Sequence, residues 1–262
     1  MWTLLLTLKF KNMIRLIIFT VTFLFTVLAS AQVSENRNVS DFSKVKVSTS
    51  IDLVFTQDSK TSVKVEADDA ERLQAIVTKV SGTTLEVYVD SKNLKGKNKN
   101  FKTLKVWVSA PSVDSFQASS SSSVTLKNGI EVKTANVEVS SSADFNGQIK
   151  ADEINANVSS SGALKSAVSS KKLNVEVNSS AEAILSGTAE NASISASSSA
   201  DFQGKDLSVK TATVEVSSSA DVVLTVTENL KTQATSSGYV SYYGNPKNVE
   251  TEKKSSGSVN KN

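Results

Sequence analysis

The sequence predicts an all-β protein, a parallel β-helix or β-solenoid of about 19-residue coils with an N-terminal β cap. Three observations predict it. A motif of small residues recurs through the second half of the chain, apolar and polar side chains alternate with a period of two around each copy, and the hydrophobic share of 39% is that of a globular chain. Together these features favour stacked strands over helices or disorder.

Composition excludes most catalytic chemistry. Histidine and cysteine are both absent from the 262 residues. An imidazole base, a thiolate nucleophile, a disulfide framework and a Cys/His metal centre are therefore unavailable. We expect no catalytic residue and no cofactor, and we predict that the protein is not an enzyme.

Residues 1–31 are predicted to be a signal peptide. Arg15 precedes a largely apolar stretch from Leu16 to Leu28, and Ala29-Ser30-Ala31 has the small residues of a cleavage site before Gln32. The stretch is shorter than the ~18 residues that a bilayer-spanning helix needs. We expect a Sec-type leader cleaved between Ala31 and Gln32, no transmembrane segment after its removal, and a location in the periplasm, at the cell surface or outside the cell.

Charge argues against a nucleic-acid partner. The chain has 29 basic and 26 acidic residues, and Lys9, Lys11 and Arg15 lie in the leader, which contains no acidic residue. The remaining protein is neutral overall, so the basic surface that binds phosphate backbones is not expected.

Residues 32–113 are predicted to form the N-terminal β cap, continuous with the solenoid. Short alternating segments indicate ordinary strands, and Ser81-Gly82 indicates a hairpin turn. Asp68 starts a capping-box-like segment of one or two helical turns. The strand segments are Val45–Val47, Ile51–Leu53, Val63–Val65, Leu85–Val87 and Leu104–Val108. A cap is expected because the end of a solenoid exposes apolar coil edges.

Residues 114–262 contain the serine-rich repeat. Taking the third small residue of each motif as an anchor, successive anchors lie 18 to 21 residues apart. The anchors are Ser121, Ser142, Ser161, Ser180, Ser199, Ser219, Ser237 and Ser256. Such regular spacing predicts one coil per repeat.

Columns of equivalent positions predict where each side chain points. Positions three, five and seven before the anchor are mostly apolar, as in Val139, Val137 and Ala135, whereas the positions between them are polar. The position after the anchor holds only Ser, Ala or Gly, and the third position after it is apolar again, as in Phe145. Each unit is therefore predicted as strand, small-residue corner and strand. A sandwich of antiparallel hairpins is the competing interpretation.

Three tyrosines follow the last regular repeats. Tyr239, Tyr242 and Tyr243 precede Gly244-Asn245-Pro246. We expect the tyrosines to seal the last coils, and a sugar-stacking platform is the alternative.

These motifs resemble the bacterial head GIN domain, a family labelled auto-transporter adhesin and common in Bacteroidetes. The resemblance rests on the Val-x-Val-Ser-Ser-Ser-Ala-Asp units, on the segment from Ser236 to Pro246 and on the closing Ser255-Ser256-Gly257-Ser258, and it covers about residues 42–259. It implies a secreted, right-handed β-helix whose molecular function is open. Family members favour Ser-Gly-Ala at the corner, where this chain mostly has Ser-Ser-Ala.

One acidic ladder is the strongest chemical signal. Glu182, Asp201 and Asp221 share the column two residues after the anchor and should stack on successive coils, with Asp144 further along the same column. Stacked carboxylates raise one another's pKa and can recruit Ca²⁺. A solvated edge is the favoured interpretation, and calcium binding or catalysis is the alternative.

We therefore expect a secreted, non-enzymatic β-solenoid that serves as an adhesin or as a binding or structural module of the cell envelope. Its partner would be a surface glycan or a protein. A calcium-dependent β-helix that binds or degrades polysaccharide is the main alternative, and an ice-binding serine array is a weaker one. The sequence does not predict an oligomeric state.

Overall fold

The structure is a computed structural model that describes residues 32–94 and 103–262, so the predicted leader and its cleavage site at Ala31 lie outside the described residues. Eighteen strands, one short helix and one 3-10 turn occur in these ranges. The first strands are β1 (Val33–Arg37), β2 (Lys44–Val47), β3 (Asp52–Gln57), β4 (Ser62–Ala67), β5 (Ile76–Ser81), β6 (Thr84–Val89), β7 (Leu104–Ala110), β8 (Ser115–Ala118) and β9 (Ser123–Leu126). The others are β10 (Ile130–Val139), β11 (Asp144–Val158), β12 (Ala163–Val177), β13 (Glu182–Ala196), β14 (Asp201–Val216), β15 (Asp221–Ala234), β16 (Tyr239–Tyr243), β17 (Asn248–Lys253) and β18 (Ser258–Lys261).

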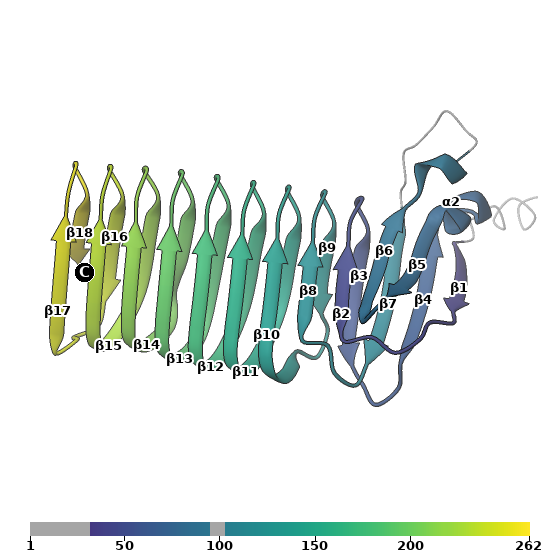
Figure 1. Cartoon of the computed structure of the whole chain (residues 1–262), viewed down its shortest axis with the longest axis horizontal. Helices are drawn as coiled ribbons and strands as arrows, with labels where there is room; N and C mark the ends of the chain where they lie inside the picture. The colour runs from purple at the N-terminus through teal and green to yellow at the C-terminus, as the bar shows by residue number, and fades with distance from the viewer. Residues whose placement is uncertain (1–31, 95–102) are drawn as a thin grey trace, which may run out of the picture.

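The repeat region is a β-solenoid, as predicted. Consecutive coils pair in parallel and in register, with Asp144 opposite Ala163 and Ala163 opposite Glu182. The coils stand side by side along the long axis of the molecule (Figure 1). Because the pairing is parallel throughout β10–β15, the competing interpretation as antiparallel hairpins is wrong.

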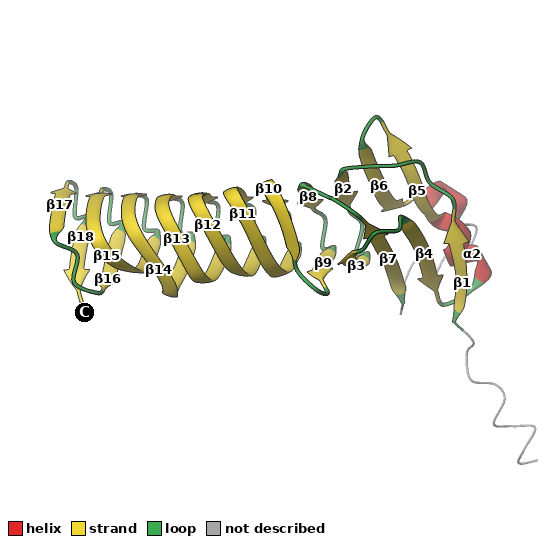
Figure 2. Cartoon of the chain, turned by 90° about the horizontal axis from the view of Figure 1, so that it is seen from below, coloured by secondary structure: helices red, strands yellow, loops and turns green. Residues whose placement is uncertain are grey.

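Each coil has one tight corner and one gradual bend. A long strand such as β11 leaves a corner on one sheet, bends around the opposite edge, and reaches the next corner on the other sheet (Figure 2). We call the sheet that enters the corners the pre-corner sheet; it contains β2, β8, β10, the second halves of β11–β15, and β17. The post-corner sheet contains β3, β9, the first halves of β11–β15, β16 and β18.

Two consecutive residues in the left-handed region form every corner. There are nine such pairs in the described residues, with φ between 47° and 66° at the serines and the one threonine concerned. The second residue of a pair donates its N–H to the carbonyl of the first residue in the next coil, as from Ser142 to Ser160 and from Ser161 to Ser179, both at 3.1 Å. The corners are therefore joined by a ladder of backbone hydrogen bonds that runs along the whole solenoid.

The position after each corner is small because the backbone of the preceding coil lies close to it. A Cβ added to Gly162 would come within 2.8 Å of the carbonyl oxygen of Val139. Ala143 fits at the same position of the previous coil and is fully buried. The predicted small-residue column therefore follows from the narrow interior at the corner.

The predicted apolar columns form a narrow core between the two sheets. Val139, Val158 and Val177 are fully buried, and so is Phe145 on the opposite sheet. Where the cap meets the solenoid, the rings of Phe55, Phe116 and Phe145 pack edge to face at centroid distances of 5.1 and 5.8 Å. Aromatic side chains thus fill the core at this junction, whereas Val and Ala fill much of the core elsewhere.

The cap extends both sheets and changes strand direction. In the pre-corner sheet, β2 pairs in parallel with β6, and β6 pairs antiparallel with β5. In the post-corner sheet, β3 pairs in parallel with β7, β7 pairs antiparallel with β4, and β4 pairs antiparallel with β1. Helix α2 (Ala70–Ala75) packs against β1, β4 and β5. The predicted capping segment starts this helix, since the Asp69 carboxylate accepts the Arg72 N–H at 2.8 Å. The 3-10 turn η1 (Ser91–Asn93) follows β6.

Within residues 32–94 and 103–262, the structure contains no helix with the length and hydrophobicity of a transmembrane span.

Candidate binding surfaces of the solenoid

The predicted acidic ladder is assembled on the post-corner sheet. Glu182 is the register partner of Asp201, and Asp201 is the partner of Asp221. Neighbouring strands lie ~4.8 Å apart, so the ladder presents one carboxylate per coil. Glu182 and Asp221 are exposed and Asp201 is half-buried.

The same column extends further toward the cap than the sequence indicated. Asp52 pairs in register with Ser123, whose hydroxyl donates to the Asp52 carboxylate at 2.7 Å, and Ser123 pairs with Asp144. Residues 58–113 separate the strand of Asp52 from the repeat in sequence, which hid its place in the column. The local signal was present, because Ser48-Thr49-Ser50-Ile51-Asp52 has the pattern of Ser140-Ser141-Ser142-Ala143-Asp144.

Although Asp221 is exposed overall, partial desolvation of its carboxylate, followed by the negative charge of Asp201, raises the pKa of Asp221 above its ordinary value. Asp201 is in turn hydrogen-bonded by the Gln203 side chain, which donates to its carboxylate at 2.8 Å. Within the described ranges no group of three or more acidic side chains is compact enough to hold a metal ion. The carboxylates form a row along the sheet and do not converge on a point.

Tyrosine continues the acidic column. Tyr239 is the register partner of Asp221 and is half-buried on the post-corner sheet. Tyr242 points inward and is buried, whereas Tyr243 is half-buried with the Lys205 ammonium 4.9 Å from its ring centre. All three lie in β16, one coil before the last one described, so β17 and β18 lie between them and the end of the stack.

An open groove lies beside the acidic column. It has a volume of about 650 Å³, and its lining includes Lys165, Ile184, Gln203 and Lys205. Ile184 is 37% exposed, which is unusual for a large apolar side chain on this sheet. The post-corner sheet therefore combines carboxylates, cations and a partly apolar surface.

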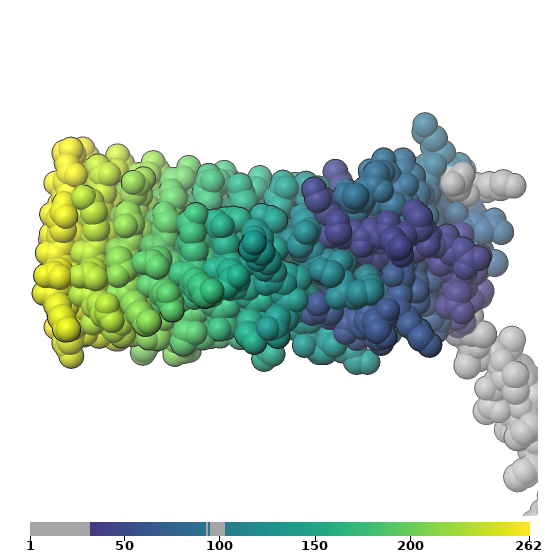
Figure 3. All heavy atoms as spheres, turned by 60° about the horizontal axis from the view of Figure 1, so that its bottom comes forward, coloured from purple at the N-terminus to yellow at the C-terminus, as the bar shows by residue number. Residues whose placement is uncertain are grey.

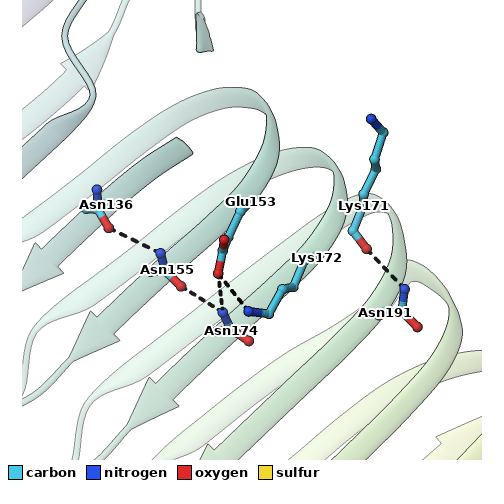
Figure 4. A network of polar contacts seen from close by, with 7 residues as sticks. All are labelled: Asn136, Glu153, Asn155, Lys171, Lys172, Asn174 and Asn191. Carbon is cyan, nitrogen blue, oxygen red and sulfur yellow. Dashed lines mark hydrogen bonds and ion pairs between the residues drawn. The ribbon is translucent and has the colours of Figure 1, made fainter. Parts of the chain in front are cut away.

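The pre-corner sheet carries a ladder of asparagines. The Asn174 amide donates to Asn155 at 2.7 Å, and the Asn155 amide donates to Asn136 at 3.2 Å (Figure 4). Glu153 accepts hydrogen bonds from Asn174 at 3.2 Å and from Lys172 at 2.9 Å. These amides are bonded to one another along the stack, as expected for stacked Asn columns, so they stabilise the coil register.

Ion pairs connect coils along the edge opposite the corners. Glu131 pairs with Lys150 at 2.8 Å and Asp152 with Lys171 at 2.8 Å, each from one coil to the next. The hydrogen bond from Lys171, and then its positive charge, hold the pKa of Asp152 below its ordinary value. Figure 3 turns this edge toward the viewer and shows the coils in close contact from the cap to the last coil. These charges are already paired within the protein, which favours a structural role.

The described part of the chain is thus a capped β-solenoid whose accessible features are long polar sheets and shallow grooves. The chain belongs to the family described as "Putative auto-transporter adhesin, head GIN domain", whose profile matches residues 41–246. This confirms the resemblance seen in the sequence motifs.

Solved structures from Bacteroidetes share the fold. A crystal structure of a "putative adhesin" from Parabacteroides distasonis is similar with a TM-score of 0.82 at 18% identity, covering 89% of this chain and 98% of that one. A "putative lipid binding protein" from the same species gives 0.81 at 23% identity with the same coverage. A "putative adhesin" from Parabacteroides merdae gives 0.80 at 17% identity, covering 89% and 97%. No curated protein matches this sequence significantly.

Proposed function

We propose that the protein is an exported, non-enzymatic adhesin that binds an extended surface glycan along its post-corner sheet. The observation that carries this proposal is the in-register column of Glu182, Asp201, Asp221 and Tyr239. A column with one polar group per ~4.8 Å offers a repeating partner one contact per coil. Family membership supports an adhesive role, and the predicted leader in residues 1–31 supports export.

The column has the chemistry that sugars require. Ionised carboxylates accept hydrogen bonds from sugar hydroxyls, and charge-assisted hydrogen bonds are the stronger kind. Tyr239 supplies a partly exposed aromatic side chain at the end of the row. A glycan chain parallel to the solenoid axis would contact each of these groups in turn.

The arrangement favours binding over cleavage. Glycosidases place two carboxyl groups on opposite sides of the scissile bond, at least ~5 Å apart. Here the carboxylates stand side by side on one sheet. Arginine for elimination chemistry is also lacking on the coils, because Arg37 and Arg72 lie in the cap, where Arg37 bonds the carbonyl oxygen of Leu73 at 3.1 Å.

The test is glycan-array binding by the protein from Gln32 onward, with calcium and with chelator. The variant E182Q/D201N/D221N removes three charges from the post-corner column. The control E138Q/E176Q/E215Q removes three exposed charges from the pre-corner sheet.

We expect binding to one glycan class that the first variant loses and the control keeps. If glycan binding required calcium and was lost in the first variant, the acidic ladder would bind the glycan through a calcium ion. Release of reducing ends or unsaturated sugars would contradict the non-enzymatic proposal. Binding that survives the first variant and fails in the control would move the site to the pre-corner sheet, and no binding in any arm would favour a protein partner.

A further inference from the structure

The last coil of the described residues has open strand edges. β17 pairs with β15 and β18 pairs with β16, and neither has a pairing partner on its other side among the described residues. At the opposite end the parallel stack passes into antiparallel strands, with α2 packed against them. Open edges of this kind are templates for pairing with another chain.

A charged residue interrupts an apolar column in this last coil. The register places Lys253 opposite Ala234, in the column three residues before each anchor. In the eight preceding coils this column is buried and contains only Val or Ala. Its members are Val47, Ala118, Val139, Val158, Val177, Ala196, Val216 and Ala234.

The Lys253 side chain crosses the open end of the core. Its ammonium donates to the backbone carbonyl of Val259 at 3.4 Å, which connects β17 on the pre-corner sheet to β18 on the post-corner sheet. Val259 itself points into the core and is buried. The neighbouring Lys254 differs, because it forms an ion pair with Glu252.

We infer that Lys253 keeps the solenoid from associating end to end with a second copy of the chain. If two copies met at their last coils across a two-fold axis, each edge strand would pair antiparallel with the same strand of the other copy, β17 with β17 and β18 with β18. The two cores would then be continuous. The Lys253 ammonium of each copy would then be buried without a carboxylate partner, which is strongly unfavourable. An inward-pointing charge is one of the means by which natural sheets protect their edges.

The test compares K253M with K254M in the full chain by sedimentation equilibrium. Methionine keeps the length of the side chain and removes its charge. We expect the wild type and K254M to stay monomeric, and K253M to form a dimer with a Kd lowered by about tenfold or more. Cooperative thermal unfolding at a protein concentration low enough to keep each variant monomeric shows that it is folded, and K253V replaces K253M if it is not.

A second variant locates the contact. Lys254 donates its backbone N–H to Ala234 of the preceding coil, so by alternation the N–H of Thr251 faces the open edge. The double variant T251P/K253M should therefore be monomeric again. A monomeric K253M, a wild type that already dimerises through this edge, or a dimer that T251P leaves intact would each overturn the inference.

Discussion

Single residues at the corners adopt a backbone conformation that usually favours glycine. All nine pairs consist of serine except for Thr49, and each non-glycine residue in this region costs ~1–2 kcal/mol. The corner serines are held there by the backbone ladder, in which Ser142 donates to Ser160 at 3.1 Å. The stability of the stack therefore depends on hydrogen bonds between coils that offset strain within them.

Replacing a corner serine by glycine should stabilise the protein. Glycine at position 142 relieves the left-handed strain but makes the unfolded chain more flexible, so S142G should gain about 0.5–1 kcal/mol. The measurement is the free energy of unfolding in urea, with S142A as the control that keeps the strain. A loss of stability in S142G would show that the serine hydroxyl contributes more than the strain costs.

Asp221 should make stability depend on pH. Because the pKa of Asp221 is raised by partial desolvation and then by the charge of Asp201, the folded protein binds this proton more tightly than the unfolded chain. The stability that the neutral Asp221 side chain contributes is fully present below its pKa in the unfolded chain, and it is lost as the pH rises through its pKa in the folded protein.

D221N should therefore be slightly more stable than the wild type at pH 7, by about 0.2–0.5 kcal/mol because water screens the repulsion at this exposed position, and the difference should shrink toward pH 3. Thermal unfolding at both pH values measures it. D144N is the matched control, since Asp144 has Ser123 and Ala163 as neighbours in its column. A difference that persists at pH 3 would rule out titration of Asp221 as the cause.

The strands and corners show what could be predicted from sequence. The period-two columns placed Val137 and Val139 inside correctly, because repetition over many coils averages out local exceptions. The passage of one strand around the opposite edge, as in β11, has no motif of its own and was not predicted. The corner at Thr49-Ser50 was missed because an insertion separates it from the repeat.

Two glycines, one within a strand and one in a turn, should respond differently to substitution. Gly187, with φ of 102°, lies at a register shift between β13 and β14, and an added Cβ would come 2.1 Å from the carbonyl oxygen of Val168. Gly82, with φ of 61°, has no atom within 4 Å of an added Cβ.

We expect G187A to lose about 3 kcal/mol or more, since strain and a backbone clash add, and G82A to lose about 1 kcal/mol from strain alone. Chemical unfolding measures both losses. Equal losses in the two variants would mean that the backbone at Gly187 moves to make room for the new methyl group.

At the scale of the whole molecule, the surface columns could be predicted because the coils repeat. The repeat spacing was sufficient to predict that Glu182, Asp201 and Asp221 stack, because coils of nearly equal length place equivalent residues side by side. The hydrogen bonds of the asparagine ladder could not be read in this way, because they depend on side-chain rotamers. The role of Lys253 was accessible in principle, since it stands three residues before the anchor Ser256, but an isolated lysine in a weak repeat gives little signal.

A whole coil should be removable. Deleting residues 163–181 brings Glu182 to the register position of Ala163 and leaves all remaining columns aligned. In repeat proteins stability is a sum over repeats and their interfaces, so this 19-residue deletion should cost about 1–3 kcal/mol and keep the fold.

Far-UV circular dichroism and thermal unfolding measure the outcome. Deletion of residues 163–172, about half a coil, is the control and should prevent folding because it shifts the apolar columns out of alignment. If both deletions behaved alike, the coil would not be the unit of stability.

The direction of the hydrogen bonds between coils also has a mechanical consequence. These bonds, including the corner bond from Ser161 to Ser179, run along the solenoid axis. A tensile force along that axis would load the coil interfaces in series, so the weakest interface would yield first while the others stayed intact. Each released coil of about 19 residues would add ~65 Å of extended chain, and the protein would lengthen stepwise under tension as an extensible tether.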